Sequence, residues 1–260
     1  LGILLPALGA ARELARQCRG MGDLRQMMVG YTQQSLDRDG QLLYGYAPGS
    51  VNGLTIEVHD DGRTYGPPIV NRYPWRLAEY VGEVWDVIYS HAGAPERPEP
   101  DDSEDDAFTK AYTLSVSPSF GINSVYVGGH HSTFYKGFVD QGSTARPNTG
   151  GHVVFRDTEV RRPASLITFT EVQRRGGGAT GDNGHFWATA PNAAGDMWQA
   201  DGKTWRITET SRVLGLPMGR YRNRTITGFM DSHIETMSAG DLDDMTLWAN
   251  EATDNDYDVP

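Results

Sequence analysis

The chain has 260 residues, of which 38% are hydrophobic and 22% are charged, with 31 glycines, 14 prolines and a single cysteine. This composition excludes a wholly disordered chain. One cysteine excludes both an internal disulfide framework and a multi-cysteine zinc or iron–sulfur site. The formal net charge of −11 makes nucleic acid a poor candidate partner. The length allows one large domain or two small ones.

The first eleven residues, LGILLPALGAA, carry no charge. As a helix this segment would be about 16 Å long, roughly half the hydrocarbon thickness of a bilayer. No basic region precedes the apolar residues, so the segment is not an intact signal peptide. We expect the numbered chain to begin partway along a longer apolar helix. The alternative is a short helix buried in a soluble protein.

The helix is predicted to continue to residue 38 and to stop at Asp39-Gly40. Apolar residues recur along it at steps of three and four, the period of an amphipathic helix. They are Leu14, Cys18, Met21, Leu24, Met28 and Tyr31. Five arginines against three acids give residues 1–38 a net charge of +2, so the rest of the chain carries −13. The helix and the body are therefore expected to face different surroundings.

Residues 39–260 are predicted to form a globular body of helices and antiparallel strands. We expect a hairpin turn at residues 60–62, a second helix over residues 74–89 and a last short helix from Ser238. Residues 91–106 are rich in proline and acids and are expected to form an exposed, mobile loop. Strands are predicted over residues 152–155, 165–171, 185–188, 204–208, 224–230 and 234–237. The fold class is therefore α+β, with a long N-terminal helix packed on an antiparallel sheet.

The sequence shows no established catalytic pattern. His130, His131, His152, His185 and His233 form no helical i, i+4 pair and no His-Glu-x-x-His motif, so we interpret them as surface or loop residues. No Gly-x-Ser-x-Gly motif occurs, and no pair of carboxylates stands out by its spacing. The sequence therefore predicts neither an enzyme nor a cofactor.

The C-terminal tail contains the candidate metal ligands. Carboxylates alternate at Asp254, Asp256 and Asp258 and offer oxygen ligands to calcium. The tail lacks the glycine and the bidentate glutamate of an EF-hand loop, so we expect a disordered acidic tail, with calcium binding as the alternative. Asn223 begins an Asn-Arg-Thr sequon and is a candidate glycosylation site, although the adjoining strand could hide it.

The start of the chain resembles a known family. It has a Leu-Leu-Pro-Ala-Leu run at residues 4–8, Ala-Arg-Glu at 11–13, Cys18, Asp-Leu-Arg-Gln at 23–26, Tyr31 and Asp-Arg-Asp-Gly at 37–40. These motifs resemble the segment after the cleavage site of type IV pilin-like proteins, in particular the planctomycete-type group of prepilin-like, pseudopilin-related proteins. The first-turn glutamate of such pilins is not in this chain.

The resemblance continues near the C-terminus. Asp231-Ser232-His233 stands where this family has Asp-Gly-His, and Tyr221 stands where it has an upstream histidine. The resemblance therefore implies no function that depends on that pair. Related pseudopilins hold calcium in a C-terminal loop, which is a second reason to consider the tail aspartates.

The resemblance implies a structural subunit of an extracellular pilus-like filament at the cell surface, inserted in the inner membrane before assembly. Its partner would be itself, in a helical homopolymer. Residues 1–38, with the apolar front truncated, would be buried among identical copies. The residues expected to carry assembly are Leu1, Ile3, Leu4, Leu5, Pro6, Leu8, Leu14, Cys18 and Met21.

Two alternatives stay open. One is a pseudopilin that works in a type II secretion-like apparatus. The other is a membrane-anchored secreted β domain that binds carbohydrate or has enzymatic activity, for which the 12 tyrosines and 6 tryptophans would supply aromatic platforms. Core and subunit-contact roles are the interpretation that we prefer for these aromatic residues.

Overall fold

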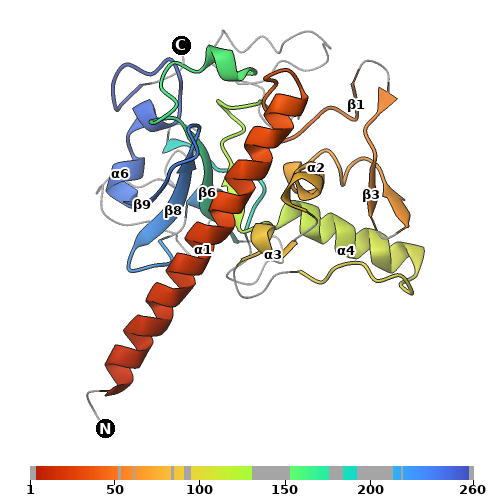
Figure 1. Ribbon diagram of the computed structural model, residues 1–260, viewed down its shortest axis with the longest axis horizontal. Helices are drawn as coiled ribbons and strands as arrows, with labels where there is room; N and C mark the ends of the chain where they lie inside the picture. The colour runs from red at the N-terminus through yellow and green to blue at the C-terminus, as the bar shows by residue number, and fades with distance from the viewer. Residues whose placement is uncertain are drawn as a thin grey trace.

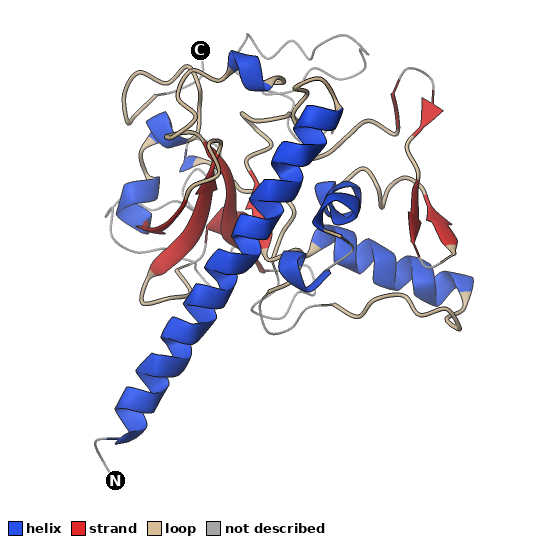
Figure 2. Cartoon of the chain, viewed as in Figure 1, coloured by secondary structure: helices blue, strands red, loops and turns tan. Residues whose placement is uncertain are grey.

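The computed structural model describes residues 4–51, 54–60, 62–82, 85–90, 95–130, 153–175, 184–191, 213–217 and 219–257. In this part of the chain a long helix crosses the molecule between an antiparallel sheet and a group of short helices and hairpins (Figures 1 and 2). The expected α+β class, with the helix packed on the sheet, is confirmed. We call the described residues from Gln41 onward the head.

Helix α1 covers Leu4–Asp37. It ends where the backbone turns left-handed, with φ of 54° at Asp39 and 79° at Gly40. The Gly40 N–H donates to the Ser35 carbonyl at 2.8 Å, which satisfies one of the last carbonyls of the helix. Glycine adopts this conformation without a steric penalty, so the end predicted from Asp39-Gly40 is confirmed.

The main sheet is antiparallel, with the order β5-β6-β8-β9, and β7 pairs with the far end of β6. Its strands are β5 (Phe120–Ile122), β6 (Ile167–Arg175), β7 (Val213–Pro217), β8 (Arg224–Phe229) and β9 (Ile234–Ser238). Phe169 pairs with Ile122 on one side and with Gly228 on the other, so β6 is the central strand.

Both faces of the sheet are covered. On one face α1 contributes Tyr31, whose ring meets Phe169 edge to face at a centroid distance of 5.6 Å. On the other, Trp248 and Phe229 belong to a second buried cluster. That cluster includes residues of the C-terminal helices α6 (Ala239–Leu242) and η4 (Met245–Leu247). The central strand is therefore buried on two sides, with α1 forming one of the covering layers.

Two short hairpins precede the second helical region. They are β1 (Ser50–Val51) with β2 (Leu54–Thr55), and β3 (Val58–Asp60) with β4 (Arg63–Tyr65). The β3–β4 pairing confirms the hairpin expected at residues 60–62, whose residue 61 lies outside the described residues.

The single helix predicted over residues 74–89 is wrong. The chain forms α2 (Tyr73–Ala78), a short 3-10 helix η1 (Glu79–Val81) and then α3 (Trp85–Ile88). Gly82 has φ of 69°, a left-handed conformation that ends η1. Apolar residues continue at helical spacing on both sides of Gly82, which is why a single helix was predicted. The left-handed backbone at this glycine nevertheless ends the helical segment.

The acidic loop predicted over residues 91–106 is shorter than expected, because helix α4 covers Glu104–Val116. The Ser103 side chain accepts a hydrogen bond from the Asp106 N–H and caps the helix. Three acids occupy the first turn, where the helix dipole favours negative charge. The acidic side chains from which a loop was predicted therefore form the first turn of a helix.

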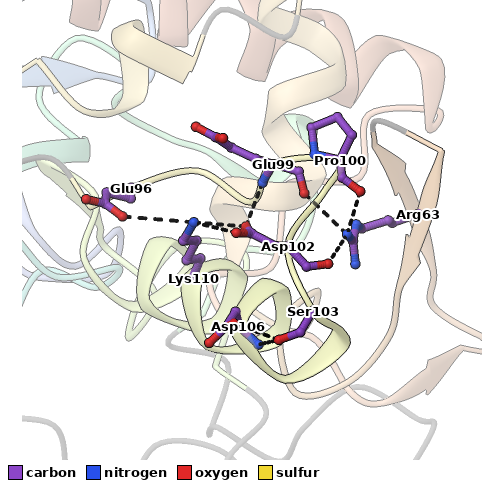
Figure 3. A network of polar contacts seen from close by, with 8 residues as sticks. All are labelled: Arg63, Glu96, Glu99, Pro100, Asp102, Ser103, Asp106 and Lys110. Atoms are coloured by element: carbon purple, nitrogen blue, oxygen red, sulfur yellow. Dashed lines mark hydrogen bonds and ion pairs between the residues drawn. The ribbon is translucent and has the colours of Figure 1, made fainter.

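Residues 95–103 are fixed to their neighbours (Figure 3). The Arg63 guanidinium donates to the carbonyls of Glu99, Pro100 and Asp102, at 3.2, 3.2 and 2.8 Å. The Asp102 carboxylate accepts from Lys110 at 2.8 Å. These contacts bind the segment to β4 and to α4, so the described part of the expected mobile loop is anchored.

Three of the predicted strands, over residues 165–171, 224–230 and 234–237, correspond to β6, β8 and β9. The predictions over 152–155 and 185–188 are wrong as strands: Val154 and Trp187 form only isolated bridges, and residue 152 is not described. The strand predicted at 204–208 lies outside the described residues. The last helix begins as expected, since Ser238 and Asp241 cap it reciprocally.

Candidate functional site: the free face of helix α1

The second half of α1 is fixed to the head through one face. Leu24, Met27 and Met28 are completely buried, and Tyr31 is 2% exposed. These residues recur at steps of three and four, so they form the core-facing side of the helix. This half of α1 is a structural element of the head.

Two glycines let this half come close to its neighbours. A Cβ atom on Gly20 would lie 2.7 Å from Ile226 Cδ1, and one on Gly30 would lie 3.1 Å from the Tyr80 carbonyl oxygen. Nothing lies within 4 Å of the corresponding position on Gly22. Gly20 and Gly30 therefore serve close packing, whereas Gly22 faces away from the head.

The first half of α1 projects beyond the head (Figure 1). Leu8 and Leu14 are 50% and 59% exposed, and Cys18 is exposed as well. The Glu13 carboxylate accepts a hydrogen bond of 3.0 Å from the Arg222 N–H, which ties the helix to the turn before β8. An apolar helix surface is thus left facing solvent in the single chain.

An apolar stripe follows the exposed side of α1 along its length, opposite the buried side. It consists of Leu8, Ala11, Ala15, Cys18, Gly22, Val29 and Leu36, all of them exposed. Their spacings of three, four and seven residues keep them on one face of a helix. Val29 and Leu36 are 60% and 68% exposed although the other side of the same helix turns is buried. Between Gly22 and Leu36 the exposed polar residues Arg25, Gln26 and Gln33 lie on the same side of the helix and interrupt the stripe.

The residues predicted to carry assembly differ in how exposed they are. Leu14 and Cys18 are exposed, and Met21 is partly buried against the core. The backbone of residues 4–6, Leu-Leu-Pro, lies in the first described turn of α1. Leu1 and Ile3 lie outside the described residues. Val29 and Leu36 were missed because the sequence alone does not show which side of α1 the head covers.

A buried carboxylic acid lies beneath α1. Glu171 is completely buried on β6, and its carboxylate accepts hydrogen bonds of 3.3 Å from the Tyr221 hydroxyl and from the Ile226 N–H. The Arg220 guanidinium lies 3.9 Å away. Burial raises the pKa of Glu171 to about 7, and these partners offset that effect only in part. Sequence reasoning did not single out this residue.

Two of the histidines expected at the surface or in loops lie outside the helices and strands but are buried. His130 and His185 are buried, with exposures of 2% and 3%. Both rings meet the Trp187 ring, at centroid distances of 5.2 and 4.0 Å. Burial, followed by the positive charge of Arg174, holds the pKa of His185 well below its usual value, so this ring is neutral. Residues 131 and 152 lie outside the described residues.

The turn between β8 and β9 contains Asp231, Ser232 and His233, the segment considered above for its sequence resemblance. Ser232 has φ of 72°, a left-handed conformation for which glycine is the favoured residue. The Asp231 carboxylate contacts the His233 ring, which stacks on Phe229 at 4.3 Å. This pair is held by local turn geometry and ring packing.

The remaining candidates are surface residues. Asp254 and Asp256 are exposed, and residue 258 lies outside the described residues. Within the ranges described, no group of three or more His, Cys, Asp or Glu side chains is arranged to hold a metal ion. Asn223 is exposed in the turn before β8, with φ of 62°, whereas Thr225 of the same sequon is buried. Calcium binding and glycosylation stay predictions.

The molecule has a hollow where α1 leaves the head. It is lined by Ala10, Ala11, Glu13, Leu14, Gln17 and Arg222, and its volume is about 250 Å³. A second hollow of about 220 Å³ lies between β3 and the helices α2 and α3, and Trp75 and Trp85 form part of its wall. Trp75 is completely buried and Trp85 is 5% exposed, so neither ring offers an open face to a sugar.

No helix among the described residues combines the length and the apolar character required to cross a membrane. Comparison of the chain with family models, with curated proteins and with solved structures finds no match.

Proposed function

We propose that the protein is the structural subunit of an extracellular pilus-like filament, in which the apolar stripe of α1 packs against helices of identical copies. The observation that supports this proposal is the full-length exposure of the stripe, from Leu8 to Leu36, on a helix whose opposite side is already used by its own head. Exposed apolar surfaces of this kind are typical of interaction sites.

The hydrophobic effect favours burial of the apolar side chains of the stripe between helices. Transfer of Leu8, Val29 and Leu36 from water into a helix interface contributes about 1.5–3 kcal/mol for each fully buried side chain, before the cost of ordering the partners. The heptad-like spacing allows these side chains to insert between residues of a second helix. The small residues Ala11, Ala15 and Gly22 permit close approach of the two backbones.

The hollow beside Leu14 fits the same arrangement. Its apolar wall is formed by Ala10, Ala11 and Leu14, and it opens where α1 separates from the head. A leucine or valine side chain from a neighbouring helix would fit into this space. Well-filled interfaces of this kind are more stable than loosely packed ones.

Assembly of identical chains through such a helix gives a filament when the rotation between neighbours does not close. The head, with its excess of acids, would then lie on the outside. Before assembly, the apolar residues at the start of the chain would be held in the inner membrane. A pseudopilin would use the same surface, and the length of the fibres distinguishes it from a pilus subunit.

Aspartate substitutions on the stripe test this proposal. Leu8→Asp with Val29→Asp should abolish fibres in electron microscopy and sedimentation, because both positions are exposed and charge there opposes helix packing. Far-ultraviolet circular dichroism should show an intact head. Thr253→Asp with Asn255→Asp is the matched control, since it adds the same two negative charges at exposed positions of the head, outside the stripe. Fibres that persist in the double variant would contradict the proposal.

A further inference from the structure

The outer face of α4 carries two exposed aromatic rings. Phe108 is 49% exposed and Tyr112 is 38% exposed, and their rings stack at a centroid distance of 6.2 Å with an interplanar angle of 22°. With Glu104 they have i, i+4, i+8 spacing, so the three side chains follow one another along one side of the helix. Large exposed aromatic side chains are enriched at protein interfaces.

This aromatic pair is held in place from below. The Tyr112 hydroxyl accepts a hydrogen bond of 3.2 Å from Arg72, whose guanidinium lies 4.6 Å from the centre of the tyrosine ring. Arg72 is itself buried and donates to Pro68 and Ser115 at 3.0 Å each. Tyr112 is therefore preorganised, and a partner would bind it with little loss of side-chain entropy.

The acids beside these rings are free to attract a cation. Asp102 and Asp106 are used internally, by Lys110 and by the Ser103 cap (Figure 3). Glu104 and Asp105 are exposed, and neither forms an ion pair with another residue of the described ranges. The outer face of α4 thus combines two aromatic rings with negative charge that the head does not neutralise.

The first half of α1 has the complementary surface. Arg12, Arg16 and Arg19 are exposed, and their i, i+4, i+7 spacing places them side by side along one edge of the apolar stripe. Arg19 lies 3.7 Å from Asp23 with 62% of its side chain exposed. Arg12 and Arg16 form no ion pair within the described part of the chain. We call these three residues the basic edge.

We infer that the aromatic and acidic face of α4 in one copy binds the basic edge of α1 in the next copy. Guanidinium groups stack on aromatic rings and pair with carboxylates, which is the combination that α4 presents. Within one molecule, α2 and α3 pack against α1, and α4 extends from them away from the projecting end of α1, so the contact must join two chains (Figure 1). The inference rests on the proposed function.

Such a contact has a direct consequence for assembly. The two surfaces differ, so each chain offers one α4 face and one basic edge, and the contact repeats head to tail, which gives an open filament when the rotation between neighbours does not close. Stripe contacts alone could end in closed helix pairs. The contact between α4 and α1 would set the direction and stagger of neighbours, through electrostatic complementarity.

Charge reversal tests the contact on the full chain. Arg12→Glu with Arg16→Glu, and separately Glu104→Arg with Asp105→Arg, should each raise the critical concentration for fibre formation by about tenfold. The chain that carries all four substitutions should return to within about threefold of the wild type, since the charges are exchanged. Phe108→Ala, at an exposed position, should raise the critical concentration without any change of charge. Asp254→Arg with Asp256→Arg is the control for reversal of acids elsewhere on the head and should have no effect.

The outcomes separate this inference from the proposed function. A wild-type chain that forms no fibres would overturn both. Wild-type fibres with either single-surface reversal assembling at the wild-type concentration would overturn the α4 contact and leave the filament proposal in place. Loss of assembly in both reversals, without recovery in the fourfold variant while circular dichroism shows folded heads, would also overturn the contact.

Discussion

Glu171 is a carboxylic acid between the central strand and helix α1, where Gly20 allows the helix to approach. Its charged form is disfavoured by burial, while the Tyr221 hydroxyl and the Ile226 N–H provide hydrogen bonds. The Arg220 guanidinium provides partial charge compensation at 3.9 Å. The protonation of this single residue therefore affects the stability of the folded chain.

The stability of the folded chain should depend on pH through this residue. The pKa of Glu171 is raised to about 7 in the folded state, so the folded chain holds its proton more tightly than the unfolded chain. The stabilising effect of that proton is complete below the unfolded value near 4.5 and is lost as the pH rises through about 7. Urea unfolding of the wild type and Glu171→Gln between pH 4.5 and 8 measures the difference.

Relative to the glutamine variant, the wild type should lose a few kcal/mol of unfolding free energy over this pH interval. Other titrating groups are common to both chains and cancel in the comparison. A difference between the two chains that stays constant with pH would show that the Glu171 carboxyl titrates as it does in the unfolded chain.

The burial of Glu171, His130 and His185 could not be predicted from the sequence. Periodicity indicates which side of an element is apolar, but polar residues give no comparable signal because they are usually exposed. Glu171 is buried because a partner on another strand satisfies it, and that pairing joins residues more than fifty positions apart. His185 is buried because Trp187 and Phe186 surround it.

Helix α1 shows how glycines on one element serve different purposes. Glycine weakens a helix by about 1 kcal/mol relative to alanine, which is the only effect that the sequence predicts. The structure shows a packing role for two of these glycines, because Gly20 lies against β8 and Gly30 lies against η1. Gly22 has open space around it and belongs to the exposed stripe.

Alanine substitutions should therefore have opposite effects at two positions on this helix. Gly30→Ala places a methyl group 2.8 Å from Val81 and 3.1 Å from the Tyr80 carbonyl oxygen, so we expect a loss of about 1–3 kcal/mol. Gly22→Ala should raise the unfolding free energy by about 1 kcal/mol, since only helix propensity changes. Urea unfolding of the unassembled chain measures both. Equal effects at the two positions would contradict the packing described for η1.

Whether each of the other elements could be predicted depends on how clear its apolar pattern and its boundaries are in the sequence. Long α1 and strands β6, β8 and β9 could be predicted, because each has a sustained apolar pattern or clear boundaries. Helix α4 was missed because its first turn, Glu104–Asp106, looks like a continuation of an acidic loop. The break at Gly82 was missed because apolar residues continue on both sides of it.

The charges of the whole molecule are arranged in two parts. Residues 1–38 carry a net charge of +2 and the rest of the chain −13. In the structure the basic residues Arg12 and Arg16 lie on the projecting half of α1, whereas Glu104 and Asp105 lie on an outer helix of the head. The sequence predicted this separation, but only the structure shows that both groups are exposed and flank apolar or aromatic surfaces.

The reactivity of Cys18 in unassembled and assembled protein tests the packing of the stripe most directly. Cys18 is the single cysteine of the chain and is exposed within the stripe, so no substitution is needed to place the probe. We expect a maleimide reagent to label it readily in the unassembled chain and at least about tenfold more slowly in fibres, because neighbouring helices would cover it. The Leu8→Asp, Val29→Asp variant should stay reactive under the same conditions. Equal labelling rates in fibres and in unassembled wild-type protein would contradict the account.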